Sequence, residues 1–149
     1  FPAVSNLTKV TVLTYTWLAC RGVSNGFPEV NTLTNALDHQ QTWGDCSANS
    51  LFPSVSNHTK ATSFYYTWKG CVRMTNSVQS LLGDCLWITG QVKNVGGTFM
   101  GCTSLSGNGM PLVTAITNSP GYPTGYTVTS CFNGCTNLTD YATIPAAFK

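Results

Sequence analysis

The first 20 residues of the chain, FPAVSNLTKVTVLTYTWLAC, recur without a gap as residues 52–71, FPSVSNHTKATSFYYTWKGC. Twelve of the 20 positions are identical. A third copy, FPEVNTLTNALDHQQTWGDC, occupies residues 27–46 and keeps the FPxV beginning and the TWxxC end. A period of 25 or 26 residues with fixed aromatic and cysteine positions is typical of a repeat protein rather than of a single globular core.

The second half of the chain continues the repeat in longer units. TFMGC at 98–102 and SCFNGC at 130–135 align with the TWxxC ends of the first three copies. We therefore predict one domain over residues 1–149 that contains five units and the beginning of a sixth. The predicted units are 1–26, 27–51, 52–76, 77–109 and 110–141, followed by 142–149.

Each unit suggests the same local structure. An apolar residue follows the cysteine after two positions, as in Cys71–Met74 and Cys102–Leu105, and a proline often follows later. We expect a short strand after each cysteine, and the stacked strands should form a parallel sheet. The Thr-rich segment before each aromatic should form a turn or short helix that packs the ring inward. The predicted fold class is a repeat solenoid of about five repeats, with short parallel β-strands and irregular turns or short helices.

The order of C-x-x-L, FPxV and T[WF]xxC resembles the BspA-like leucine-rich repeats. The most similar segments are SNHTKATSFYYTWKGC, GTFMGCTSLSG and SCFNGCTNLTDYATIP. The resemblance covers nearly the whole chain, although the leucine positions are often Val, Asn or Met. It implies a surface-exposed adhesion or interaction module, and similar repeats occur in bacteriophage tail-fibre and other virion proteins.

The composition excludes several classes of protein. The chain has 7 Lys+Arg and 5 Asp+Glu, so 8% of its residues are charged, against about 25% in an average soluble domain. A net charge of +2 does not suggest a nucleic-acid-binding protein. No apolar run approaches the ~18 residues that indicate a membrane span. A surface rich in Thr, Ser, Asn and Gly favours an extracellular, cell-surface or virion location.

Few residues could support catalysis. The chain has two histidines and five carboxylates, and it lacks both the G-x-S-x-G motif and the CxxC pairs of metal sites. The neighbours Asp38 and His39 suggest a solvated turn rather than part of a catalytic triad. We predict a non-enzymatic protein without a cofactor or metal.

The repeated cysteines and aromatics are predicted to form the structural core. Five cysteines share one repeat position, which favours buried, reduced thiols over disulfides. Cys85 and Cys131 lie outside that position, so a disulfide between them is the less favoured alternative. The predicted core residues are Trp17, Trp43, Trp68, Phe99, Phe132, Cys20, Cys46, Cys71, Cys102 and Cys135.

Aromatics outside the repeated position are candidates for ligand contact. We predict Trp87, Tyr122, Tyr126 and Tyr65 as contact residues, and Tyr15 and Tyr66 could also reach the surface. Tyrosine provides contact area and hydrogen bonding without charge, which suits protein or glycan ligands. Three N-x-[ST] sequons mark possible glycosylation sites at Asn6, Asn57 and Asn137.

These observations predict a surface recognition or adhesion module. The alternative is a structural assembly protein, a subunit of a virion or extracellular filament. Both ends, FPAV and IPAAF, are apolar and in register with the repeat. Such ends would either belong to a longer repeat array or let subunits stack head to tail.

Overall fold

The computed structural model describes all 149 residues, Phe1–Lys149. It contains two short α-helices and three single-turn 3-10 helices. They are α1 (Val78–Leu82), η1 (Leu86–Ile88), α2 (Met110–Thr117), η2 (Tyr141–Thr143) and η3 (Ala146–Phe148). Both α-helices are far too short to cross a lipid bilayer.

The predicted fold class, a solenoid of short parallel β-strands, is wrong. The chain forms no strand and no sheet, and parallel pairing is limited to isolated bridges. The segments after the cysteines, which we expected to be strands, consist mainly of turns and bends, with one bridge between Ser77 and Ser106. The physical reason is that local turn hydrogen bonds follow the cysteines, such as Met74 N–H to Cys71 O and Leu105 N–H to Cys102 O. Left-handed residues beside the repeated aromatics, such as Tyr15 and Tyr66, also interrupt the extended backbone that a strand requires.

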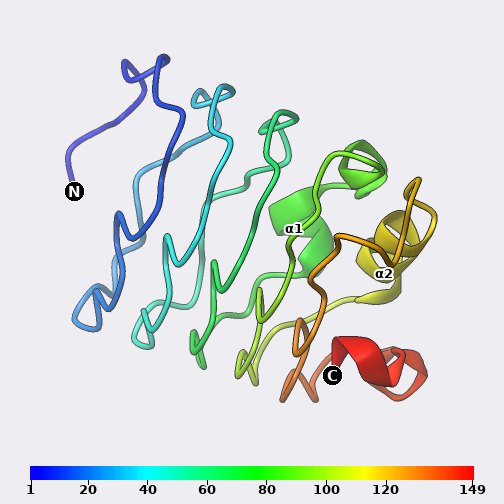
Figure 1. Cartoon of the computed structure of the whole chain (residues 1–149). Helices are drawn as coiled ribbons and strands as arrows, with labels where there is room; N and C mark the ends of the chain where they lie inside the picture. The colour runs from blue at the N-terminus through cyan, green and yellow to red at the C-terminus, as the bar shows by residue number, and fades with distance from the viewer.

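The chain instead winds through five successive turns that lie side by side (Figure 1). We call them coils 1–5, with the unit boundaries given above. The segments that precede the repeated aromatics form one face, which we call the front face. A single bridge joins each front segment to the next, always five residues before the aromatic, through Val12, Asp38, Ser63, Asn94 and Thr127. Backbone N–H groups of one coil donate to carbonyls of the next, for example Trp17 N to Thr42 O at 2.8 Å.

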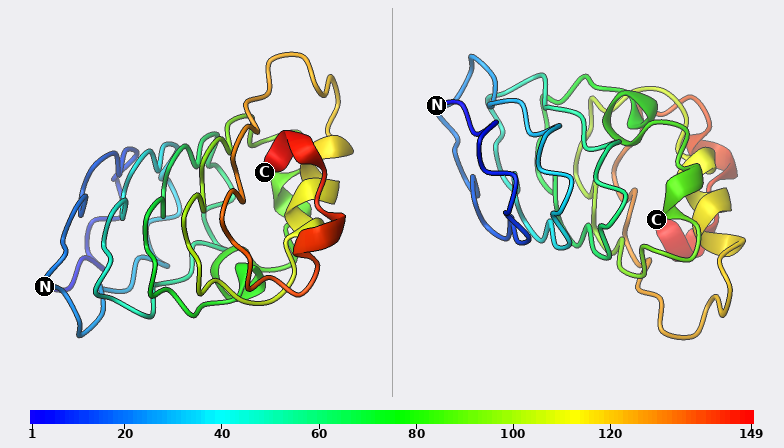
Figure 2. Two further views of the ribbon diagram at one scale, coloured as in Figure 1. Left: turned by 90° about the horizontal axis from the view of Figure 1, so that it is seen from below. Right: turned by 90° about the horizontal axis from the view of Figure 1, so that it is seen from above.

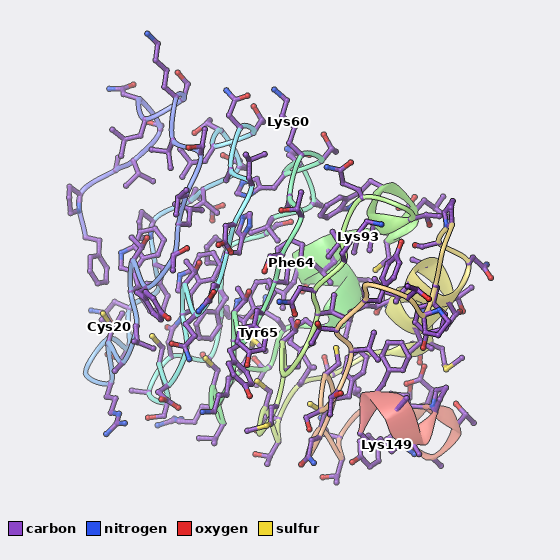
Figure 3. All side chains as sticks on the ribbon, in the orientation of Figure 1. Cys20, Lys60, Phe64, Tyr65, Lys93 and Lys149 are labelled. Carbon is purple, nitrogen blue, oxygen red and sulfur yellow. The ribbon has the colours of Figure 1, made fainter.

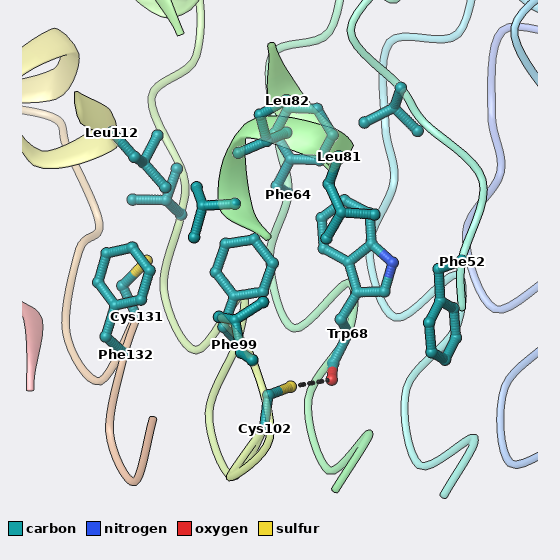
Figure 4. Packing of buried hydrophobic residues seen from close by; sticks show 14 of the residues in the cluster. Phe52, Phe64, Trp68, Leu81, Leu82, Phe99, Cys102, Leu112, Cys131 and Phe132 are labelled. Carbon is teal, nitrogen blue, oxygen red and sulfur yellow. Dashed lines mark hydrogen bonds between the residues drawn. The ribbon is translucent and has the colours of Figure 1, made fainter. Parts of the chain in front are cut away.

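The repeated aromatics stack in one column inside the coils (Figure 4). The ring centroids of Trp17 and Trp43, and of Trp43 and Trp68, are 5.5 Å apart. Phe99 continues the column at 5.2 Å from Trp68, and Phe132 lies 5.6 Å from Phe99. All five side chains are buried. These spacings lie within the range of favourable aromatic pairs, so the column joins all five coils.

The repeated cysteines form a second column beside the rings. Each thiol from coil 2 onward donates to the backbone carbonyl of the aromatic in the preceding coil. The Sγ–O distance is 2.9 Å from Cys46 to Trp17, and the dashed line in Figure 4 marks the 2.9 Å bond from Cys102 to Trp68. The corresponding distances are 3.1 Å for Cys71 to Trp43 and 2.9 Å for Cys135 to Phe99.

All seven cysteines are free, including Cys85 and Cys131, for which a disulfide was the less favoured prediction. Burial raises the pKa of the Cys46 and Cys135 thiols to about 12, so they are unreactive near neutral pH. Cys20, in the first coil, is only half-buried.

Helical segments take up the extra residues of coils 4 and 5. Figure 2 shows α1, α2 and the C-terminal turns together at one end of the molecule. Residues 142–149, expected to begin a sixth unit, cover coil 5 instead. Phe148 O accepts the Phe132 N–H at 2.8 Å, and Ile144 and Phe148 are buried. This end of the stack is therefore capped.

Candidate functional site

The front face offers two outward positions in every coil, three and two residues before the aromatic. The residue two before the aromatic has a positive φ in each coil, with values of 58, 49, 55, 57 and 60°. This left-handed turn directs both side chains away from the core. The outward pairs are Thr14–Tyr15, Gln40–Gln41, Tyr65–Tyr66, Gly96–Gly97 and Thr129–Ser130.

Polar and aromatic side chains gather on the first three coils of this face. We call Tyr15, Gln40, Tyr65, Tyr66 and Lys69 the tyrosine patch (Figure 3 labels Tyr65). Gln40 Nε2 donates to the Tyr15 hydroxyl at 2.8 Å, which joins coils 1 and 2. The ring centroids of Tyr65 and Tyr66 are 4.1 Å apart. Lys69 Nζ lies 5.1 Å from the Tyr66 ring centroid, and this is the only cation of the patch.

Two glycines of coil 4 provide the surface against which the tyrosines of coil 3 rest. A Cβ at Gly97 would overlap the Tyr66 ring at Cε1, and a Cβ at Gly96 would lie 3.2 Å from Tyr65 Cε2. The Tyr66 ring can therefore approach the coil 4 backbone only because Gly97 lacks a side chain, and a Cβ at Gly96 would crowd the Tyr65 ring. The sequence Gly96–Gly97 thus supports the tyrosine patch although it contributes no side chain. The repeat alignment alone gave no signal for this role.

Tyr122 and Tyr126 lie together on the loop that follows α2. Their rings meet edge to face with centroids 5.6 Å apart, and the Tyr126 hydroxyl donates to Pro120 O at 3.2 Å. Lys93 Nζ lies 4.7 Å from the Tyr126 ring centroid. This pair is therefore ordered by its own contacts, separately from the pair of Tyr65 and Tyr66.

Trp87, the fourth predicted contact residue, packs into the structure instead of standing free on the surface. Its indole Nε1 donates to Leu82 O at 2.9 Å, and its ring lies edge-on to buried Phe64. The side chain is half-buried. Because its polar atom is already satisfied, Trp87 has little to offer a ligand.

The three sequon asparagines are all exposed. Asn6 and Asn57 occupy the same position in the turns of coils 1 and 3, opposite the cysteine turns. Asn137 lies after Cys135, and its Nδ2 donates to Ser104 O at 3.4 Å.

A cavity of about 570 Å³ lies between η1 and α2. Its lining includes two carboxylates, but both oxygens of Asp140 accept backbone N–H groups, from Gly109 and Met110, at 2.8 Å. Asp84 accepts the Leu86 N–H at 2.9 Å. The two carboxylates thus serve local backbone structure, and no group of three or more potential metal ligands forms anywhere in the chain.

The expected solvated turn at Asp38 and His39 is wrong for the histidine. His39 is fully buried and its Nε2 lies 2.7 Å from Nδ1 of His58, which is also fully buried. The repeat alignment contained the signal, because His39 aligns with Leu13 and Phe64, and both of those side chains are buried. Asp38 remains half-exposed and accepts the Gln40 N–H.

Comparisons of the chain with models of protein families, with curated proteins and with solved structures each find no match. The similarity to BspA-like repeats thus stays a prediction that rests on the repeat residues. The candidate site must be interpreted from its own geometry.

Proposed function

We propose that this protein is a non-enzymatic recognition module that binds an uncharged glycan or polypeptide surface through the tyrosine patch. The observation that carries the proposal is the array formed by Tyr15 of coil 1, Gln40 of coil 2, and Tyr65 and Tyr66 of coil 3. Tyrosine buries a large area at low entropic cost and still offers a hydroxyl for hydrogen bonding. One lysine among these side chains suits a neutral ligand better than an anionic one.

Preorganisation of the patch supports the same proposal. Tyr15 is held by Gln40, and Tyr66 is held between Tyr65, Lys69 and the bare backbone of Gly97. A surface that is already ordered loses less conformational entropy when it binds. We also propose an extracellular or virion location, and the support for it is the low content of charged residues.

The test is a binding screen with glycan and protein arrays, followed by affinity measurement on any hit. We expect Tyr66→Ala to weaken binding about tenfold or more, as at a tyrosine hot spot. Gly97→Ala should also weaken binding, although it removes no tyrosine, because its Cβ would displace the Tyr66 ring. Gly26→Ala is the matched control, since Gly26 also has a positive φ and a Cβ there meets no atom within 4 Å. Unchanged affinity in both Tyr66→Ala and Gly97→Ala would exclude the patch as the binding surface.

Head-to-tail assembly has less support than recognition. A subunit stacked on coil 5 would have to displace the C-terminal cap, because Phe148 O already occupies the Phe132 N–H. Light scattering after size-exclusion chromatography, over a range of concentrations, separates the two functions. A monomer at all concentrations excludes assembly, whereas growing oligomers would favour it.

A further inference from the structure

Two histidines occupy core positions that the repeat otherwise fills with apolar residues. His39 lies at the inward position of the front segment, where the other coils have Leu13, Phe64, Val95 and Val128. His58 aligns with Leu33 of coil 2. Both imidazoles are fully buried, and the His39 ring lies 4.7 Å from the ring of Phe64. These two are the only histidines of the chain.

The hydrogen bonds of the pair fix the proton positions on both rings. His58 Nε2 lies 2.8 Å from Val30 O, and a carbonyl can only accept, so this nitrogen carries a proton. In the neutral ring, His58 Nδ1 is then an acceptor, and His39 Nε2 must donate to it across 2.7 Å. His39 Nδ1 is left as a buried acceptor without a partner. The chain of bonds runs from His39 through His58 to Val30.

Protonation is unfavourable on either ring. The only unprotonated nitrogen of His58 is Nδ1, which accepts the hydrogen bond from His39. The unprotonated Nδ1 of His39 is buried, and no protein group there could accept a hydrogen bond from it once it is protonated. No carboxylate compensates a positive charge there. The neighbouring Asp38 accepts the Gln40 N–H, and Lys60 donates to Asn35 at the surface, so His39 and His58 face only each other as titratable groups. Burial accordingly lowers the pKa of His39 to about 3 and also lowers that of His58.

We propose that the His39–His58 pair is an acid-sensitive latch that holds the Val55–Ala61 turn of coil 3 against coil 2. At neutral pH both rings are uncharged and the two hydrogen bonds close the turn. A proton from solvent on either free nitrogen creates a buried imidazolium. On His58 Nδ1 it also replaces the acceptor of the His39 N–H, so that bond breaks and the turn opens.

The direction of the pH effect follows from the sign of the pKa shifts. Each histidine has a lower pKa in the folded chain than in the unfolded chain, where it is about 6.5. The unfolded or open state therefore binds more protons, and the latch is fully effective above about pH 6.5. Its contribution is lost as the pH falls from about 6.5 toward the folded-state pKa.

The first test compares unfolding of the wild type and of His39→Leu/His58→Leu between pH 7.5 and 4.5. Leucine is the natural residue at both aligned positions in other coils. For a single buried histidine, the unfolding equilibrium constant rises about tenfold for each pH unit below about 6.5. In the wild type, His39 alone should therefore raise this constant about thirtyfold between pH 7.5 and pH 5. The double variant should retain only the smaller acid dependence of the carboxylates. Parallel pH profiles for the two proteins would overturn the proposal.

The second test uses only the wild type, so it does not depend on whether the variant folds. Nitrogen-15 NMR of the two histidine rings should show two neutral rings at pH 5.5, each protonated at Nε2. The protection factors of the His58 and Ala61 amides, whose N–H groups close the turn, should fall on acidification more than that of the Trp43 amide. Two rings that titrate near pH 6.5, or a uniform fall in protection factors throughout the chain, would contradict a local latch.

Discussion

Coil 1 and coil 5 follow the same repeat but are stabilised differently. Within residues 1–26 only Leu13 and Trp17 are buried, and Phe1 remains 61% exposed. Coil 5 buries residues along α2 as well as at its repeat positions, and the C-terminal turns cover it. The buried apolar residues of coil 5 are Leu112, Val113, Ala115, Ile116, Cys131, Phe132, Cys135 and Leu138.

Coils 1 and 5 share the contacts of the repeat itself but differ in the contacts that neighbouring segments add. The aromatic, the bridge and the front-face turn are present in both coils. Coil 1 draws its remaining stability from contact with coil 2, whereas coil 5 is packed on both sides. We therefore expect the same substitution to cost more in the middle and at the capped end than in coil 1.

The largest expected effect is at the centre of the aromatic column. Trp68→Ala should destabilise the protein by about 3–5 kcal/mol, because Trp68 is fully buried between Trp43 and Phe99. Trp17→Ala, at the less covered end, should cost clearly less. Urea denaturation of both variants measures the difference, and equal losses would show that coil 1 is as well supported as coil 3.

A smaller effect is expected where the cap meets coil 5. In Gly109→Ala the new Cβ would lie 2.7 Å from Ile144 Cδ1 and 3.2 Å from Phe132 Cζ. Overpacking of this kind typically costs about 1–3 kcal/mol. Gly22→Ala in coil 1, where a Cβ meets open space, should change stability little. A neutral Gly109→Ala would show that the cap packs more loosely than described.

The smallest expected effect concerns the start of α2. Both Asp140 oxygens accept N–H groups at the helix N-terminus, from Gly109 and Met110. Asp140→Ala should cost about 0.5–2 kcal/mol, the usual range for loss of an N-terminal cap. Thermal unfolding at pH 7 provides the measurement, with Asp84→Ala as a comparison at η1. A larger loss for Asp84→Ala would mean that η1, not α2, supports this end.

The sequence predicted which residues are buried better than it predicted the backbone conformation. The positions of Trp17, Trp43 and Trp68 follow from spacing alone, because a residue that recurs once per coil must stack on its equivalents. The strands did not form because spacing does not specify backbone conformation. Non-glycine residues such as Tyr15 and Tyr66 adopt left-handed φ values of 58 and 55° that propensity does not foresee.

The candidate site was only partly predictable. Tyr65 and Tyr66 stand out in the sequence. Their packing against Gly96 and Gly97, however, depends on contacts between residues of two coils that are 31 positions apart in the chain. Trp87 appeared available because it lies outside the repeated position, yet its indole binds Leu82 O only five residues away. Contacts of this kind arise from the local path of the chain, which the repeat does not encode.

The most direct test of the account is the accessibility of the thiols in the native state. Alkylation at pH 8, mapped by mass spectrometry of the peptides, should modify half-buried Cys20 first. The six buried thiols should remain protected until the chain unfolds. Four of them also donate to the backbone carbonyl of the aromatic in the preceding coil. Modification of Cys71 or Cys102 at the rate of Cys20, or a native disulfide between repeated cysteines, would contradict the stacked columns.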